Sequence, residues 1–216
     1  KVFDMTVAST GLAAKRLKQW GMEYQSSVTH SASHAGYYPG SIPMTLKINF
    51  SPEDGKLLGA QVVGMDGADK RLEMLAAVIR TGGSVQDLME LDQAYAPPFS
   101  SAKDPVNMAG FVADNMLSGK VKMISWRELK DMDRSKVMLV DVRTAEEFAM
   151  GSIEGAVNIS LDGSRGEYQK LPKDRTIVVF CAIGLRGYIA ARVLMQHGYD
   201  VVNLNGGYRT YSTAMA

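Results

Sequence analysis

Two continuous apolar runs constrain the fold of this chain more than any other feature. Residues 137–142 and 176–180 consist mostly of Val, Ile, Leu, Met and Phe. Runs of this kind are typical of strands that are buried on both faces of a parallel sheet. The second half of the chain is therefore predicted to contain an α/β domain with a mainly parallel sheet.

Helical patterns alternate with strand patterns throughout the same half. Ser125 and Thr144 each begin a capping box, and a helical pattern over residues 188–197 stops at Gly198. Shorter apolar segments predict further strands, at residues 123–124, 156–159 and 201–204. This rhythm of strand and helix supports the α/β prediction.

The first half has antiparallel character instead. Residues 44–50 alternate between apolar and polar, a turn interrupts them, and residues 57–63 resume the pattern, which predicts a β-hairpin. We expect a strand over residues 2–8 and a helix over residues 10–20. Further helices are predicted over residues 68–81, from Ser84 through Leu91, and from Pro105 to about residue 117. The first half is therefore predicted to be an α+β domain with an antiparallel sheet and helices.

The boundary between the two patterns predicts two domains. At roughly 150 residues per domain, the length of 216 residues allows one big domain or two modest ones. The pattern changes at residues 119–122, which we interpret as the linker between a domain at 1–119 and a domain at 123–216. The chain begins at Lys1 without an initiator Met, so we expect it to be a fragment whose N-terminal part is missing.

Charge and cysteine content exclude several classes of function. The formal net charge is +1, which gives no net attraction to nucleic acid or to an anionic membrane. The single cysteine cannot form an intramolecular disulfide or supply a thiolate zinc cluster, and the chain has no apolar run of about 20 residues. We therefore expect a cytoplasmic protein with no metal, nucleic-acid or membrane site.

The segment after the second apolar run is the strongest candidate site. Cys181 follows a predicted buried strand and precedes a helix, so it lies at the carboxyl end of a parallel strand, where ligands bind in α/β sheets. Gly184 and Gly187 allow the backbone to curl so that its amides face inward, and Arg186 adds a positive charge. The amides, the helix dipole and Arg186 would all stabilise the thiolate, which is the reactive form of cysteine. This arrangement favours a reactive cysteine over the alternative, an inert cysteine in the core. The predicted anion-binding loop comprises Ala182, Ile183, Gly184, Leu185 and Gly187.

Beyond this loop, the second half resembles the rhodanese family of sulfurtransferases. The resemblance covers roughly residues 123–213 and rests on the loop and on the segments at 139–143, 146–151, 153–159 and 205–208. It implies that Cys181 carries sulfane sulfur as a persulfide and that Arg186 helps to bind an anionic donor such as thiosulfate. Asp141 and Arg143 match positions that orient the loop, and Ser152 stands where many relatives have His, a departure that we expect to affect packing.

A phosphatase is the competing interpretation of the same motif. Phosphatases of this fold have a loop that is one residue longer between the cysteine and the arginine. Cys181 and Arg186 have four residues between them, so the shorter loop favours a single sulfur atom over a phosphate.

The first half is similar to the C-terminal dimerisation domain of flavin-dependent pyridine nucleotide-disulfide oxidoreductases. The similarity rests on residues 3–11, 37–40, 58–61 and 95–105. The last segment is especially similar to the coenzyme A-disulfide reductase and NADH oxidase branch, in which some members carry a rhodanese domain at the C-terminus. It implies that Tyr95 and one of Tyr37 or Tyr38 approach the active site of a partner subunit. Lys70 and Arg71 begin a helix, where they would be solvated or would meet a phosphate.

The two resemblances together imply an NAD(P)H- and FAD-dependent disulfide or persulfide reductase of the rhodanese-fusion type. FAD, NAD(P)H and coenzyme A are implied for the longer parent, and no cofactor is expected on this chain, which has neither G-x-G-x-x-G nor a P-loop. A homodimer and small sulfur-containing substrates are the expected partners: persulfide, polysulfide, thiosulfate and coenzyme A persulfide. The alternative is a module that only dimerises and docks, without catalysis.

Overall fold

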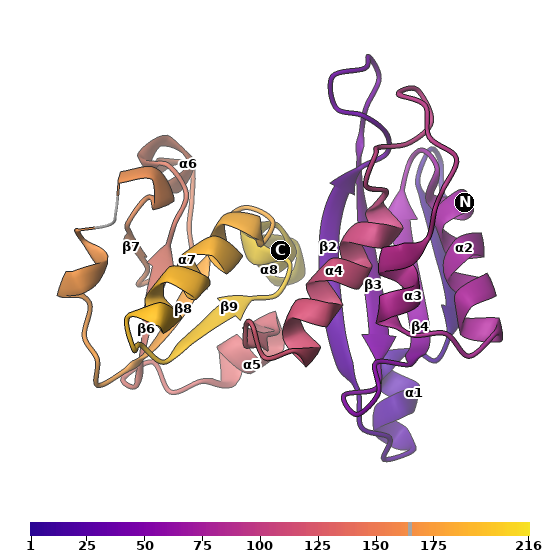
Figure 1. Cartoon of the computed structure of the whole chain (residues 1–216). Coiled ribbons are helices and arrows are strands. Elements are labelled where there is room, and N and C mark those ends of the chain that lie inside the picture. The colour runs from indigo at the N-terminus through magenta and orange to yellow at the C-terminus, as the bar shows by residue number, and fades with distance from the viewer. Residues whose placement is uncertain (164–165) are drawn as a thin grey trace. The chain divides into compact units, whose positions relative to one another are not determined.

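A computed structural model describes residues 1–163 and 166–216 and divides the chain into two compact units (Figure 1). The first unit is Lys1–Leu117 and the second is Ser118–Ala216. Each unit contains one sheet with its own helices, and each is described separately below.

The first unit is built on a four-stranded antiparallel sheet. Its strands have the order β1-β4-β3-β2. The predicted hairpin is confirmed, because β3 and β4 pair from Met44 opposite Gly64 to Phe50 opposite Leu57. The strands are β1 (Thr6–Gly11), β2 (Gln25–Ala32), β3 (Pro43–Phe50) and β4 (Leu57–Gly64).

Three helices cover one face of this sheet (Figure 1). Helix α2 (Ala68–Arg80) packs on β1 and β4, α4 (Pro105–Leu117) packs on β2 and β3, and α3 (Val85–Glu90) packs on α4. The alternate residues Leu46, Ile48 and Phe50 of β3 are fully buried in the core between the sheet and these helices. The structure thus confirms the predicted α+β class for this half.

Two elements of the first unit differ from the sequence prediction. The first strand begins at Thr6, and the following helix α1 (Ala14–Gln19) begins four residues later than predicted, because Ser9 and Thr10 pair with β4 and continue the sheet. Strand β2 was not predicted. It consists largely of polar residues, and pairing with β3 along its whole length stabilises it where its own apolar pattern does not.

The second unit contains a five-stranded sheet whose pairs are all parallel. The strand order is β5-β9-β8-β6-β7. The predicted α/β class is therefore confirmed, including the burial of β8, where Ile177 to Phe180 have no exposed surface. The strands are β5 (Met123–Ile124), β6 (Val137–Asp141), β7 (Val157–Asn158), β8 (Thr176–Phe180) and β9 (Val201–Leu204).

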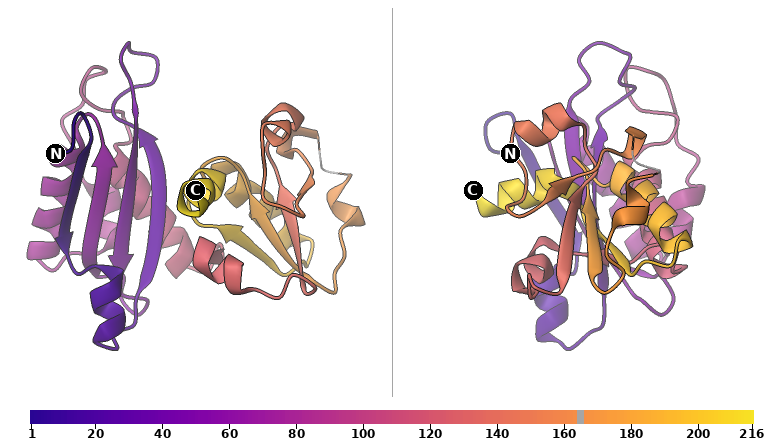
Figure 2. Two further views of the ribbon diagram at one scale, coloured as in Figure 1. Left: turned by 180° about the vertical axis from the view of Figure 1, so that it is seen from behind. Right: turned by 90° about the vertical axis from the view of Figure 1, so that its left-hand side faces the viewer.

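Helices lie on both sides of this sheet, as the right-hand view of Figure 2 shows. Val178 and Phe180 of β8 share a core cluster with Leu129 of α5 and Tyr208 of α8, while α7 packs on β8 and β9. The helices are α5 (Trp126–Asp131), α6 (Ala145–Ala149), α7 (Leu185–Gln196) and α8 (Gly207–Met215), and two 3-10 turns, η1 (Leu161–Gly163) and η2 (Tyr168–Lys170), precede β8. The sequence prediction placed the start of α7 at residue 188, three residues too late.

Candidate active site at the carboxyl edge of the parallel sheet

Cys181 lies directly after the central strand β8 and leads into helix α7. The adjacent strand β6 ends beside it, because Asp141 pairs with Phe180 in the ladder. The whole Cys181 residue is only 1% exposed, so its thiol lies beneath the surface. Two neighbouring parallel strands therefore bring their carboxyl ends together at this cysteine, as the sequence predicted for a ligand site.

The turn after Cys181 points a backbone donor at its sulfur. The Gly184 amide donates to Cys181 Sγ at 3.1 Å. Gly184 has a φ of +113°, a conformation that side chains disfavour, and it caps the N-terminus of α7. The thiol thus faces an amide donor at the N-terminus of a helix, which is an arrangement that binds anions in proteins.

The sequence prediction assigned too much of this segment to a loop. The irregular part ends at Gly184, and Leu185, Arg186 and Gly187 form the first turn of α7. Leu185 is 60% exposed, whereas Gly187 is buried. Ala182 and Ile183 complete the short turn between β8 and the helix.

Arg186 forms a two-pronged ion pair with Glu147, the third residue of α6. Its Nη1 and Nη2 donate to the two carboxylate oxygens at 2.6 and 2.7 Å. The hydrogen bond to Arg186 is the main cause that lowers the pKa of Glu147 to about 2. The same hydrogen bond raises the pKa of Arg186, and the side chain of Cys181 raises it further. Both Glu147 and Cys181 therefore stabilise the charged guanidinium of Arg186, and its ion pair with Glu147 was not predicted.

Asp141 and Arg143 form a buried ion pair beside the cysteine turn. The Arg143 guanidinium donates to both oxygens of Asp141 at 2.7–3.0 Å, and its Cζ lies 4.4 Å from the centroid of the Tyr208 ring. Ser152 Oγ donates to Asp141 Oδ2 at 2.7 Å. Ser152 therefore makes a specific polar contact with this pair, beyond the packing effect that the sequence suggested.

The N-terminus of α8 closes the turn from the other side. The amides of Tyr208 and Arg209 donate to the carbonyl oxygens of Cys181 and Ala182 at 2.8 and 2.9 Å. Gly207 allows this close approach, since a Cβ there would lie 2.5 Å from the Cys181 oxygen. Gly207 is thus explained by the contact between α8 and the cysteine turn, while Gly206 has a left-handed φ of +73° as the N-cap of α8.

Asn203, on the neighbouring strand β9, was also missed by the sequence analysis. Its side chain is fully buried, and its Nδ2 donates to the Gly184 carbonyl oxygen at 3.2 Å. It therefore holds the glycine whose amide faces the sulfur. A polar residue inside an otherwise apolar strand was the signal that could have indicated it.

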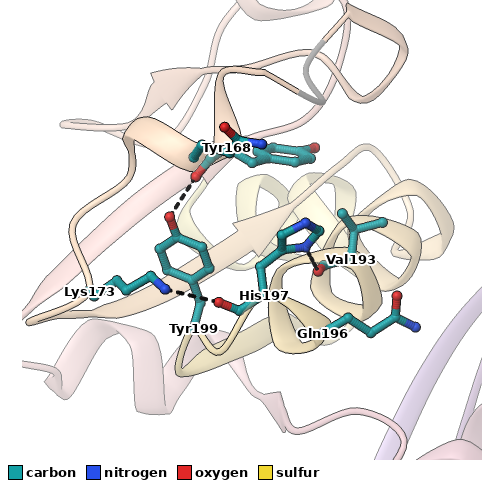
Figure 3. A pocket seen from close by; sticks show the side chains of 7 residues that line it. Tyr168, Lys173, Val193, Gln196, His197 and Tyr199 are labelled. Atoms are coloured by element: carbon teal, nitrogen blue, oxygen red, sulfur yellow. Dashed lines mark hydrogen bonds between the residues drawn. The ribbon is translucent and has the colours of Figure 1, made fainter.

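A hollow in the second unit lies away from this site (Figure 3). It has a volume of about 550 Å³ and lies at the C-terminal end of α7, whereas Cys181 precedes the N-terminal end. Its polar groups bond to one another: the Tyr199 hydroxyl donates to Tyr168 O, and Lys173 Nζ donates to His197 O. The hollow contains no residue of the cysteine turn.

In the first unit, two of the three predicted tyrosines meet. The hydroxyls of Tyr37 and Tyr95 lie 2.7 Å apart on exposed segments, and this hydrogen bond is the main cause that raises the pKa of Tyr95. Tyr38 instead packs edge-on against His34, with ring centroids 5.9 Å apart. The structure therefore brings Tyr37 to Tyr95 and leaves Tyr38 outside the pair.

Arg71 corrects a sequence interpretation. It is neither solvated nor available to a phosphate, because it is 1% exposed and its Nη2 lies 2.7 Å from Asp104 Oδ2. Asp104 also accepts from the Val106 amide at the start of α4. Arg71 thus ties α2 to the start of α4.

Neither a metal cluster nor a membrane-spanning helix is found among residues 1–163 and 166–216. No group of three or more His, Cys, Asp or Glu side chains in these ranges could hold a metal ion. No helix described here is long and apolar enough to cross a membrane.

Each of the two units contains the match to one family model. Residues 1–106 match the pyridine nucleotide-disulphide oxidoreductase dimerisation domain. Residues 125–214 match the rhodanese-like domain.

Two solved structures resemble the chain over both units. The reduced CoADR-RHD of Bacillus anthracis is 44% identical, with a TM-score of 0.97 over 100% of this chain and 39% of that one. A NAD-dependent persulfide reductase from A. fulgidus is 37% identical, with a TM-score of 0.86 over 96% of this chain and 37% of that one. A coenzyme A disulfide reductase of Staphylococcus epidermidis is 41% identical over 113 residues, which are 52% of this chain and 25% of that protein. The chain thus spans well under half the length of these relatives.

Proposed function

Because the chain joins the dimerisation and rhodanese domains of the coenzyme A disulfide reductase and persulfide reductase family, we propose that its second unit transfers sulfane sulfur through a persulfide on Cys181. The observation that carries the proposal is the Gly184 amide, which faces Cys181 Sγ at the N-terminus of α7. A terminal persulfide sulfur is an anion, and backbone amides at a helix N-terminus bind anions.

The reaction is a displacement at sulfur. The Cys181 thiolate attacks the outer sulfur of a persulfide R–S–SH, the S–S bond of the donor breaks, and R–S⁻ leaves with the bonding electrons. Cys181 then carries –S–SH, and an acceptor thiolate removes the outer sulfur by the same kind of step. The second step regenerates the cysteine, so no external oxidant or reductant is needed.

Arg186 and the turn residues have supporting roles in this proposal. The charge of Arg186 is stabilised in part by Cys181, and its guanidinium would orient the sulfur donor. Ala182, Ile183 and Gly184 form the turn that connects Cys181 to α7. The pair of Asp141 and Arg143 keeps the end of β6 fixed beside it. Four residues between cysteine and arginine leave less space than a phosphatase loop, which favours sulfur as the transferred group.

For the first unit we propose a role in a homodimer of the longer parent. The hydroxyls of Tyr37 and Tyr95 form an exposed hydrogen-bonded pair, and a phenol hydroxyl can donate a hydrogen bond to a substrate in a partner subunit's active site. The sequence has no glycine-rich phosphate-binding motif, so flavin and nicotinamide binding are assigned to other domains of the parent. Tyr95→Phe in the parent enzyme should slow disulfide or persulfide reduction, and an unchanged rate would remove this role.

Mass spectrometry of Cys181 tests the proposed sulfur transfer. We expect incubation with an alkyl persulfide to add the mass of one sulfur to Cys181, and a thiol acceptor to remove it again. Cys181→Ser is the control and should neither gain the sulfur nor turn over. If wild type and Cys181→Ser transfer sulfur at equal rates, the second unit is a docking module and the proposal is wrong.

A further inference from the structure

Glu147 balances the charge of the cysteine turn, and the sequence predicted for it only the capping box that begins at Thr144. The segment from Cys181 to Gly187 has one charged side chain, Arg186. Both terminal nitrogens of that guanidinium donate to Glu147, at 2.6 and 2.7 Å. The positive charge of the segment is thus balanced by a carboxylate from a different helix.

Glu147 is held in place independently of Arg186. Its Oε2 accepts from the Thr144 amide at 3.0 Å, and its own amide donates to Thr144 Oγ1, which completes a capping box at the start of α6. The side chains of Glu147 and Arg186 are 29% and 30% exposed, so their charges are screened less than those of a surface pair. The carboxylate therefore stays beside Arg186 when a donor approaches.

The charges at the turn disfavour a highly charged donor. Glu147 remains ionised throughout the neutral range, since its pKa is lowered to about 2. A Cys181 thiolate and Glu147 carry one negative charge each, and Arg186 carries one positive charge. Their sum is one negative charge, which repels a dianion more strongly than an uncharged or singly charged donor.

We propose that Glu147 is a specificity-determining residue that selects alkyl persulfides over dianionic thiosulfate as sulfur donors. This inference rests on the proposed persulfide chemistry of Cys181. With thiosulfate, the thiolate attacks the outer sulfur and sulfite leaves as a dianion; with an alkyl persulfide, R–S⁻ leaves. Both steps place one sulfur on Cys181, so the ratio of their rates reports how the site treats the donor.

Glu147→Gln tests the proposal, because glutamine keeps the shape of the side chain and an oxygen for the Thr144 amide but removes the charge. We expect kcat/KM for thiosulfate to rise about tenfold, equivalent to about 1.4 kcal/mol, mainly through a lower KM. We expect less than about a twofold change with the persulfide of N-acetylcysteamine, whose alkyl group is uncharged. The gain with thiosulfate should shrink as salt is added.

Glu146→Gln is the matched control. Glu146 is the adjacent carboxylate in the same helix turn, and its hydrogen bonds are to its own amide and to Thr144, with none to Arg186. This variant should keep the donor preference of the wild type. A large gain with thiosulfate in Glu146→Gln would assign the effect to general surface charge and overturn the role of Glu147.

The remaining outcomes are also decisive. An unchanged thiosulfate KM in Glu147→Gln would overturn the proposal, and so would an equal loss with both donors, which would make Glu147 a support for Arg186 only. If neither donor places sulfur on wild-type Cys181, sulfur transfer itself has failed. The mass measurement on Cys181 separates that failure from a failure of donor selection.

Discussion

The buried ion pair between Asp141 and Arg143 leads to a stability prediction whose size follows from the structure. Asp141 is fully buried and Arg143 is 5% exposed. The carboxylate accepts from the Arg143 amide, from its guanidinium and from Ser152 Oγ, at 2.7–3.0 Å. Asp141→Ala removes this acceptor and leaves a guanidinium buried without its counter-ion.

The expected loss in free energy of unfolding is about 3 kcal/mol. Removing one partner of a buried ion pair costs about 3–5 kcal/mol. The low end applies because Arg143 keeps two other contacts, a hydrogen bond to Gly151 O at 2.6 Å and the ring of Tyr208. Because the free energy of unfolding of a small domain is about 5–15 kcal/mol, a loss of this size would be a large share of the stability of the second unit.

Tryptophan fluorescence can follow the second unit alone. Trp126 lies in this unit and Trp20 in the first, so a Trp20→Phe background removes the signal of the first unit. Urea unfolding would be compared for the background, Asp141→Ala, Arg143→Met and the double variant Asp141→Ala/Arg143→Met. The double variant should lose less than the sum of the two single losses, because it buries no unpaired charge.

Two results would refute this reasoning. A loss below about 1 kcal/mol for Asp141→Ala would show that the pair behaves like an exposed one. Strictly additive losses in the double variant would show that the two side chains do not depend on each other.

Two further predictions follow from close contacts. Gly187→Ala should destabilise the second unit by about 1–3 kcal/mol in the same urea assay, because the added Cβ would lie 2.3 Å from Asn203 Oδ1. Gly163→Ala is the control and should leave the stability nearly unchanged, because a Cβ there would have no atom within 4 Å. Equal losses in the two variants would contradict the argument. Tyr37→Phe should lower the raised pKa of Tyr95 toward its ordinary value, because the hydrogen bond that favours the protonated phenol is lost. Phenolate absorbance followed against pH measures the pKa of Tyr95. An unchanged titration curve would contradict this prediction.

The sequence by itself determined the architecture and the place of the cysteine. Apolar runs at residues 137–142 and 176–180 and alternating helices predicted a parallel sheet, and the structure confirms it. The order of strand, Cys181 and helix also predicted that the cysteine lies at the carboxyl edge of that sheet. These features are local, because periodicity and capping residues depend on neighbours within a few positions.

Tertiary structure decided which side chains surround the site. Glu147 meets Arg186 across 39 positions of sequence, and Tyr37 meets Tyr95 across 58. Arg71 had the pattern of a solvated helix residue, yet contact with Asp104, 33 positions away, buries it. Periodicity shows which face of a helix or strand is apolar, but it does not show which distant segment covers that face. The charge balance at the cysteine turn depends on which distant segment lies beside it, and only the folded chain determines that.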